Sequence, residues 1–459
     1  MMETAYYFRE LFGLWEIFPC LNHILFSLAL FWSFVEICFY MRLNFHMLPK
    51  INKLTDPAKY PRNPEFLMKS VIEKLEGLVH EGHYCYKRFF SWWHRGAPFE
   101  KIRYGNLFEW LAWSMFTIHT EDLTRTQAES VKNTIKLIEQ KLEYKFPKGF
   151  DREVKAVRFT LEPIATFYRP FIVYFILLLV KKLGDLLLRL KGFRWYTTAG
   201  IGYWYRPKLK HQRIENLEDP LPMVFYHGLG TGIVLCLRLI FRLSYGRPAF
   251  LIELNHVAPS LQFENLGYQE LPKKTQQILQ RHGAKKCCVV GHSFGTVCAG
   301  WLIKYLPNVV GQAVFLDPVC FLLWLPDIAY NFLYKEPTNF VEWILSRGIS
   351  LEPTISNSLR RHFWWYQNIL HYEDLHCPAV VSLGAKDEVF AADSVKGYFG
   401  MHLRKEDVKE SDNLILHWEP HHTHGRILIS KRAQKNLLSS INLQQKKKSL
   451  TGQEQAITH

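Results

Sequence analysis

The sequence Cys287-Cys288-Val289-Val290-Gly291-His292-Ser293-Phe294-Gly295 places a serine between two glycines, directly after a short apolar run. The run predicts a buried strand, and the residues that follow through Ile303 have helical patterning. A serine in such a turn is presented at the edge of a sheet, beside a helix N-terminus whose dipole favours developing negative charge. Because glycine has no side chain, Gly291 and Gly295 allow the strand and the helix to pack closely. We therefore predict that Ser293 is a nucleophile.

A cluster of histidines near the end of the chain contains candidates for the base that this serine needs. A serine hydroxyl is a weak nucleophile at neutral pH until a neighbouring base accepts its proton. The strand predicted from Leu414 to His417 leads into His421-His422-Thr423-His424-Gly425, and a helical run follows. His424 directly precedes the glycine and the helical run, so we predict that it is the base. His421 and His422 remain alternatives.

Two aspartates follow predicted strands between the serine and the histidine cluster. Asp387 comes just after the strand that ends in Ser382-Leu383-Gly384, and Asp317 follows the strand at 313–316. In hydrolases with this type of turn, the acid follows the serine and precedes the histidine in the chain. We predict that Asp387 is the acid and keep Asp317 as the alternative. The other interpretation of Asp317 is that it supports its loop through backbone hydrogen bonds.

The glycine-rich loop Tyr226-His227-Gly228-Leu229-Gly230-Thr231-Gly232 follows an earlier predicted strand. Its glycines allow backbone N–H groups to turn inward, as an oxyanion hole requires. We predict that the amides of Leu229 and Phe294 form this hole. No Gly-Lys-Ser/Thr follows and no acid stands at dinucleotide-fingerprint spacing, so no cofactor is predicted. No carboxylate or thiol completes a close ligand set around His80-Glu81-Gly82-His83, so no metal is predicted.

Short apolar runs alternate with helical stretches over residues 215–430, which predicts an α/β domain with a mostly parallel sheet. Aromatic and helical sequence at 320–375 interrupts this alternation and is predicted to be a cap over Ser293. Residues 51–214 are predicted to be helical, with a capping-box pattern at Thr124-x-x-Gln127. Residues 431–459 are predicted to be a polar, solvated tail. The predicted strands contain residues 223–226, 249–252, 287–290, 313–316, 379–383 and 414–416.

Two apolar segments lie in the N-terminal half. Ile17–Val35 is long enough to span a bilayer, and the basic residues after it place its C-terminal flank in the cytosol. Residues 1–50 are therefore predicted to be a membrane anchor, with a buried core helix as the alternative. The segment at 164–180 has basic residues on both sides, which conflicts with simple spanning. An interfacial helix at the lipid headgroups or a helix packed on the soluble domain fits it better.

The composition is globular, with an excess of positive charge and aromatic residues. Of 459 residues, 48% are hydrophobic and 22% charged, which excludes an overall disordered or collagen-like chain, and the length indicates more than one ordinary domain. A net charge of +15 and 15% aromatic residues suggest nucleic acid or an anionic membrane as partner. The basic residues concentrate beside the apolar segments, and no nucleic-acid motif occurs. We therefore predict a membrane partner and no nucleic acid, and make no prediction of the oligomeric state.

The nine cysteines are odd in number, form no Cys-x-x-Cys pair and often lie in apolar runs. This usage predicts free thiols in a reducing compartment, although one bridge remains an alternative. Together with the anchor, it predicts an intracellular membrane with the catalytic domain facing the cytosol.

These motifs resemble the α/β-hydrolase superfamily over about residues 215–430, roughly half of the chain. The wider arrangement is similar to a little-characterised, membrane-associated group of α/β hydrolases from algae, fungi and protists. The resemblance implies a mostly parallel eight-stranded sheet with helices on both faces, an inserted cap and a serine hydrolase fold. It does not extend to the N-terminal half. The motifs that carry it are Tyr203-Trp204-Tyr205-Arg206, His227-Gly228-Leu229-Gly230, Gly291-His292-Ser293-Phe294-Gly295, Leu316-Asp317-Pro318-Val319, Arg361-His362-Phe363-Trp364-Trp365 and Glu373-Asp374-Leu375.

Within that superfamily, epoxide hydrolases and dehalogenases have an aspartate where this chain has Ser293, so the serine points to acyl transfer. The aromatic residues of the cap favour a lipophilic substrate, because clefts for apolar ligands are lined in this way. We therefore predict a lipase- or esterase-like serine hydrolase that cleaves a lipophilic carboxylic ester through an acyl-enzyme. An acyltransferase or thioesterase with the same triad, or a non-catalytic membrane scaffold that retains the fold, are the alternatives.

Overall fold

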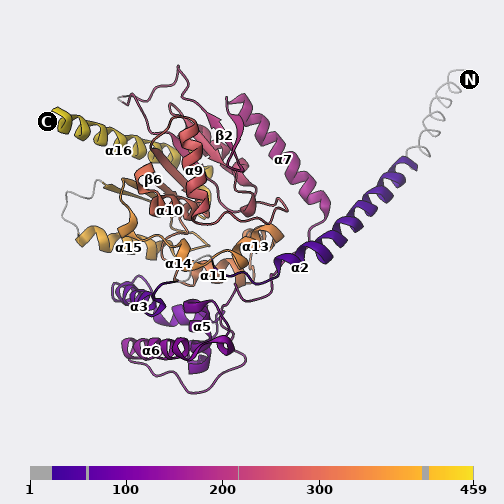
Figure 1. Cartoon of the computed structure of the whole chain (residues 1–459), viewed down its shortest axis with the longest axis vertical. Coiled ribbons are helices and arrows are strands. Elements are labelled where there is room, and N and C mark those ends of the chain that lie inside the picture. The colour runs from indigo at the N-terminus through magenta and orange to yellow at the C-terminus, as the bar shows by residue number, and fades with distance from the viewer. Residues whose placement is uncertain (1–22, 58–60, 216, 406–412, 458–459) are drawn as a thin grey trace, which may run out of the picture.

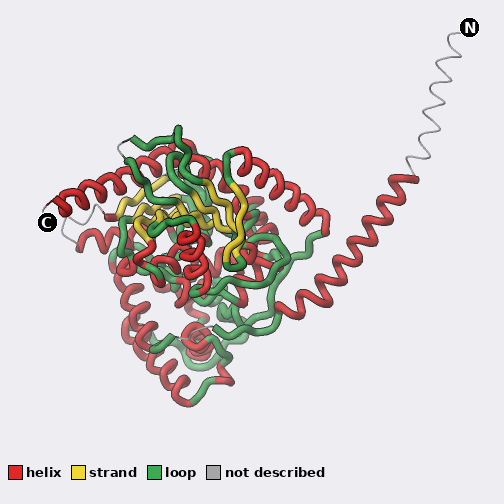
Figure 2. The backbone as a smooth tube through the Cα atoms, turned by 45° about the horizontal axis from the view of Figure 1, so that its top comes forward, coloured by secondary structure: helices red, strands yellow, loops and turns green. Residues whose placement is uncertain are grey.

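An eight-stranded sheet forms the centre of the molecule, with helices around it (Figure 2). The computed structural model describes residues 23–57, 61–215, 217–405 and 413–457. The strand order is β1-β2-β4-β3-β5-β6-β7-β8, and β2 is antiparallel to both of its neighbours. All the other neighbouring pairs are parallel. This order, with the second strand reversed, is that of the α/β-hydrolase fold, so the predicted fold class is confirmed.

Six of the eight strands contain the apolar runs predicted from the sequence. Every residue of β3 to β7 is buried, because helices cover both faces of the sheet. The last strand is less buried because it lies at the edge. These strands are β3 (Met223–Tyr226), β4 (Ala249–Ile252), β5 (Cys287–His292), β6 (Val310–Leu316), β7 (Ala379–Gly384) and β8 (Leu414–Glu419).

The first two strands, β1 (Arg194–Thr198) and β2 (Ile201–Arg206), lie before residue 215, the domain boundary predicted from the sequence. That boundary is wrong, because this hairpin extends the same sheet. Its two turn residues, Ala199 and Gly200, have φ values of 53° and 78°. A two-residue turn with positive φ at both positions matches the twist of paired strands. The aromatic and β-branched residues on either side of the turn were the sequence signal for this hairpin.

Two separate apolar cores join the helices to the two faces of the sheet. On one face, α9 (Glu270–Arg281) and α10 (Gly295–Tyr305) bury side chains against the strands. On the other face, α8 (Leu237–Leu243) and α16 (Lys431–Ile457) do the same.

The helix α16 corrects the prediction that residues 431–459 are a solvated tail. Ala433, Leu437 and Ile441 recur every four residues and are all buried in the core of the second face. A stripe at this spacing lies along one side of a helix. The Gln444 side chain also donates a hydrogen bond of 3.1 Å to the carbonyl of Ala379 at the start of β7. The segment contains many lysines and glutamines, so its average composition does not indicate that one side is apolar.

The cap lies between β6 and β7, and the N-terminal helical region packs against it (Figure 1). Arg88 forms an ion pair with Asp327 of the cap. The indole of Trp93 donates a hydrogen bond of 3.2 Å to the Trp324 carbonyl. The cap contains α11 (Asp327–Ala329), α12 (Phe340–Trp343), α13 (Pro353–Arg361) and α14 (Trp365–Asn368), and the N-terminal region contains α3 (Pro64–His80), α4 (Tyr86–Trp93), α5 (Tyr104–Phe116) and α6 (Arg125–Leu142).

The helix α6 begins where its sequence predicts. The Thr124 hydroxyl accepts a hydrogen bond from the Gln127 amide, and the Gln127 side chain accepts one from the Thr124 amide. The predicted capping box is thus confirmed. One face of the helix, which includes Val131, Ile135 and Ile138, is buried against the other N-terminal helices.

Two apolar helices lie outside these layers. A helix of 29 residues, His23–Ile51, is long and apolar enough to cross a membrane, and only 6% of its most apolar stretch is buried. The start of the predicted segment Ile17–Val35 lies outside the described residues. The second helix, α7 (Phe171–Leu190), begins and ends later than the predicted segment 164–180. Pro170 precedes its first turn, and the helix continues through Lys181 and Lys182.

Candidate active site

The turn that carries Ser293 connects β5 to α10 in a conformation that side chains rarely adopt. Ser293 has φ of 52°, in the left-handed region, and its amide donates a hydrogen bond of 2.9 Å to the Leu316 carbonyl. A Cβ on Gly291 would stand 2.5 Å from the Gly295 carbonyl oxygen. A Cβ on Gly295 would stand 2.1 Å from that of Tyr226. Only glycine therefore allows α10 to start this close to the central strands.

We expect Gly295→Ala to lower the free energy of unfolding by about 3 kcal/mol or more, because the Cβ would collide with rigid backbone. The control is Gly77→Ala in α3, where a Cβ would meet nothing within 4 Å. This change should raise the free energy of unfolding by about 0.5 to 1 kcal/mol through helix propensity. Urea unfolding followed by tryptophan fluorescence measures both. Equal stability of the two variants would show that α10 can move away from β3 without strain.

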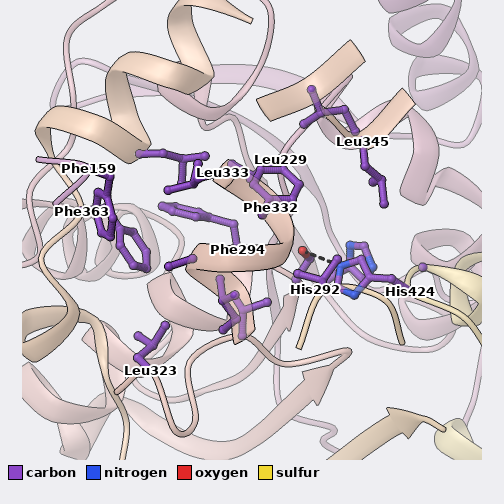
Figure 3. Close-up of a pocket in the computed structure, with 18 of the residues that line it drawn as sticks. Phe159, Leu229, His292, Phe294, Leu323, Phe332, Leu333, Leu345, Phe363 and His424 are labelled. Carbon is purple, nitrogen blue, oxygen red and sulfur yellow. Dashed lines mark hydrogen bonds between the residues drawn. The ribbon is translucent and has the colours of Figure 1, made fainter. Parts of the chain in front are cut away.

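Three side chains from separate strand ends form one chain of hydrogen bonds. The Nε2 atom of His424 lies 2.9 Å from the Ser293 hydroxyl (Figure 3). Its Nδ1 atom lies 2.7 Å from a carboxylate oxygen of Asp387. The other oxygen of Asp387 accepts hydrogen bonds from the amides of Val389 and Phe390, at 2.8 and 3.2 Å. The carboxylate is thus held in place, and it favours the tautomer with Nδ1 protonated, whose Nε2 is free to accept the serine proton.

The alternatives left open by the sequence have other contacts. The His422 ring lies 3.8 Å from the Glu419 carboxylate, and its carbonyl accepts a hydrogen bond from the Lys386 amide, beside Asp387. Of the three candidate histidines, His424 is the one hydrogen-bonded to Ser293.

Asp317, the alternative acid, holds the histidine loop by its backbone. It is buried, and its carboxylate accepts a hydrogen bond of 2.8 Å from the amide of Gly425. Glu388 does the same for the amide of His424, at 3.1 Å. Sequence analysis considered Asp317 as a loop support but missed Glu388, although it directly follows Asp387.

Carboxylates on three sides change the acid–base properties of His424. Burial disfavours the charged ring, but the negative charges of Asp387, Asp317 and Glu388 outweigh it and raise the pKa of His424 to about 9. The neighbouring His292 lies 3.8 Å from Asp317, and burial together with the charge on His424 lowers its pKa to about 3. His292 is therefore neutral, whereas His424 is well suited to hold a proton.

The loop with the predicted oxyanion amides runs directly beside Ser293. A Cβ on Gly228 would stand 2.9 Å from the Ser293 Cβ, so this approach requires glycine. Within the described residues, neither the Leu229 amide nor the Phe294 amide donates to another group of the chain. Both residues line the cavity at the nucleophile. Two unused N–H groups at this position can bind an oxyanion.

His227 positions this loop, a role that sequence analysis missed. Its Nδ1 atom lies 2.8 Å from the Gly228 carbonyl, and its Nε2 accepts a hydrogen bond of 3.0 Å from the Leu254 amide. Burial lowers the pKa of His227, so the ring is neutral and can both donate and accept. Its position directly after a strand and before two loop glycines was the sequence signal for this role.

A cavity of about 190 Å³ opens at Ser293 and is lined almost wholly by aliphatic and aromatic side chains. Figure 3 shows His424 at one end and Phe159 and Phe363 at the other. Trp93 and Phe159 come from the N-terminal region, to which sequence analysis assigned no chemistry. The remaining apolar lining includes Leu235, Phe294, Leu323, Phe332, Leu333, Leu345, Ile349, Leu359 and Trp365.

No protein-family model and no curated protein matches this sequence. Among solved structures, a carboxylesterase from Bacillus subtilis is 13% identical, with a TM-score of 0.41 over 58% of this chain and 98% of that protein. A bacterial membrane phospholipase A is 14% identical, with a TM-score of 0.42 over 59% and 94%. A serine hydrolase from Cycloclasticus zankles is 14% identical, with a TM-score of 0.39 over 55% and 97%. These similarities are low, so the fold is assigned here from the strand order and the site from the chain's own residues.

Proposed function

We propose that this protein is a serine hydrolase that cleaves a lipophilic carboxylic ester through an acyl-enzyme. The observation that carries the proposal is the chain of hydrogen bonds from Ser293 through His424 to Asp387 at one end of an apolar cavity. A histidine nitrogen 2.9 Å from a serine hydroxyl, with a carboxylate on the other ring nitrogen, supports catalysis over the role of a non-catalytic scaffold.

In the first half of the reaction, the Ser293 oxygen attacks the ester carbonyl while the Nε2 atom of His424 accepts the serine proton. The amides of Leu229 and Phe294 donate to the oxyanion that forms. Asp387 stabilises the imidazolium ring through Nδ1. When the intermediate collapses, His424 passes its proton to the alcohol oxygen, and the alcohol leaves an acyl group on Ser293.

In the second half, His424 takes a proton from a water molecule, which attacks the acyl carbonyl. A second oxyanion binds the same two amides, and its collapse releases the carboxylic acid and restores the serine hydroxyl. Between these steps the apolar cavity holds the acyl chain, because burying each CH₂ group contributes about 0.8 kcal/mol. This preference for apolar groups supports a lipophilic acyl chain over a small polar one.

A fluorophosphonate probe and a series of nitrophenyl esters test this proposal. The probe should label the purified protein on Ser293, and labelling should be lost in Ser293→Ala. kcat/KM should rise from the acetyl to the octanoyl ester as the chain fills the cavity. Labelling that persists in Ser293→Ala would reject the nucleophile, and a preference for the acetyl ester would reject the lipophilic substrate.

The carboxylates around His424 predict an alkaline pH dependence. Base catalysis needs neutral His424, and its pKa is raised to about 9, so kcat/KM should rise with pH until about pH 9. Asp317→Asn removes one of the charges that favour the imidazolium, and should move the midpoint about one unit toward acid. Glu153→Gln, at an exposed carboxylate in an ion pair with Lys101, is the control and should leave the midpoint unchanged. An unshifted profile in Asp317→Asn would contradict this account of His424.

A further inference from the structure

Apolar side chains are exposed on α12, on the 3-10 helix that contributes Leu235 to the cavity, and on α7, which packs on that 3-10 helix. On α12, Phe340, Val341 and Trp343 have exposed fractions of 73%, 55% and 46%. Leu235, on the short 3-10 helix Gly232–Cys236, is 57% exposed. The third element is the outer face of α7, where Ile176, Leu178, Leu179, Leu183, Leu186 and Leu190 are between 49% and 73% exposed. We call these residues the mouth surface.

Apolar residues connect the mouth surface to the cavity. Leu235 is exposed and also lines the cavity. The π-helical segment Ile344–Ser350 directly follows α12, and its Leu345 and Ile349 line the cavity as well. A lipid chain that touches Leu235 is therefore already at the wall of the cavity that contains Ser293.

The helix α7 is held in place between these elements. A Cβ on Gly184 would stand 2.8 Å from a methyl group of Val234, so α7 packs tightly on the 3-10 helix that carries Leu235. Just before α7, Arg169 donates hydrogen bonds to the carbonyls of Arg347 and Leu351, which follow α12. These contacts hold α7 against the 3-10 helix and link the residue before α7 to the segment that follows α12.

The N-terminal helix is fixed to the beginning of α7. The Glu36 carboxylate accepts hydrogen bonds from the first two amides of α7, those of Phe171 and Ile172, at 2.8 and 3.2 Å. Phe39 packs against the rings of Phe171 and Tyr174. Figures 1 and 2 both show α7 running crosswise to the N-terminal helix, on the side of the body from which that helix projects. A bilayer crossed by the N-terminal helix would therefore meet α7 lengthwise.

Charge on α7 fits the same orientation. Lys182 and Arg189 are exposed in its second half, and Lys191 follows its end. Exposed leucines beside lysine and arginine are the composition of a helix that lies at a lipid interface. Each basic residue near an anionic surface contributes about 1 kcal/mol of attraction. Contact with another protein would not require this combination in the second half of the helix.

We propose that the mouth surface rests on the bilayer, so that the Ser293 cavity takes its substrate, an acyl lipid ester, directly from the membrane. The acyl chain then occupies the cavity toward Phe159 and Phe363, while the alcohol part stays at the mouth near the headgroups. The statement about substrate rests on the proposed function. The docking of the mouth surface does not.

Photo-crosslinking tests the docking without any use of catalysis. The full-length protein is reconstituted into vesicles of phosphatidylcholine and phosphatidylserine that contain a phosphatidylcholine with a diazirine acyl chain. After illumination, lipid adducts should appear on peptides of α12 and α7 as well as on residues 23–51. Adducts confined to residues 23–51 would overturn the proposal. Loss of a dimer in Phe340→Ser, without lipid adducts on α12, would assign the surface to a second copy of the chain and overturn it as well.

Activity measurements then test the route of the substrate. Phe340→Ser/Trp343→Ser removes exposed apolar groups that do not line the cavity. This variant should keep its rate on a soluble nitrophenyl ester and lose more than about tenfold on a fluorogenic acyl lipid in vesicles. Phe66→Ser/Leu443→Ser is the matched control at exposed positions on α3 and α16, and should keep both rates. Equal loss on both substrates, or no loss on vesicles, would overturn the route. No hydrolysis by the unaltered protein would instead reject the proposed function and leave the crosslinking result to decide the docking.

Discussion

Ser293→Ala is expected to lower kcat for ester hydrolysis by about 10⁴- to 10⁶-fold, because no acyl-enzyme can form without the hydroxyl. A residual rate should remain from the oxyanion amides and from substrate binding. Steady-state hydrolysis of the octanoyl ester measures the effect, with enzyme concentrations high enough to detect the slow variant. Alanine can occupy the same backbone position, so the fold should be unchanged.

The matched control for this change is Ser439→Ala on α16, where the exposed hydroxyl donates a hydrogen bond to the Lys435 carbonyl. It should retain full activity. Circular dichroism and thermal unfolding of both variants establish that neither has lost the fold. A Ser293→Ala protein that keeps more than about 1% of the activity would exclude the acyl-enzyme mechanism.

Asp387→Asn is expected to lower kcat by about 10⁴-fold. An asparagine can turn its amide group toward Nδ1 of His424, which favours the tautomer with Nε2 protonated. That tautomer has no lone pair for the proton of Ser293 at the 2.9 Å contact. The charge that stabilises the imidazolium is lost as well.

The comparison variant is Asp317→Asn, since Asp317 is the other aspartate that the sequence allows as acid. Its carboxylate bonds to the backbone of Gly425 and not to the ring of His424, and an asparagine oxygen can accept the same bond. We expect less than about a tenfold loss at high pH, where His424 is neutral in both proteins. A larger loss in Asp317→Asn than in Asp387→Asn would reverse the assignment of the acid.

The parallel part of the fold could be predicted because its local signals agree with the final structure. The strands β3 to β7 are buried on both faces and therefore consist of continuous apolar runs. The turn at Ser293 is similarly local, since its two glycines are required by contacts within a short stretch and with the adjoining strand. The hairpin of β1 and β2 was missed because β1 is the edge strand and is largely exposed, so it is not a continuous apolar run.

The tail was misjudged, whereas the second apolar segment differs from its prediction only in its bounds. Both α16 and α7 bury only one side. Most residues of each helix lie on the other side, so these residues dominate its average composition. In α16 the buried stripe is narrow and the rest is polar. In α7 the outer side is apolar too, and the length of the helix is limited by Pro170 at its beginning. Composition over a window does not separate two sides of a helix, whereas packing does.

The sequence alone determined the fold class, the candidate nucleophile and the set of residues from which its proposed partners come, because these depend on local patterns and on chain order. Only the tertiary structure decided which histidine reaches Ser293. The three candidates His421, His422 and His424 lie within four positions. Gly425 has a left-handed φ of 76°, and the His424 amide donates a hydrogen bond to Glu388. These two features direct the His424 ring toward Ser293. Only the tertiary structure, too, shows that Trp93 and Phe159 line the same cavity as Ser293, which lies far from them in the sequence. Such contacts depend on how separate elements pack, and no pattern in either element contains that information.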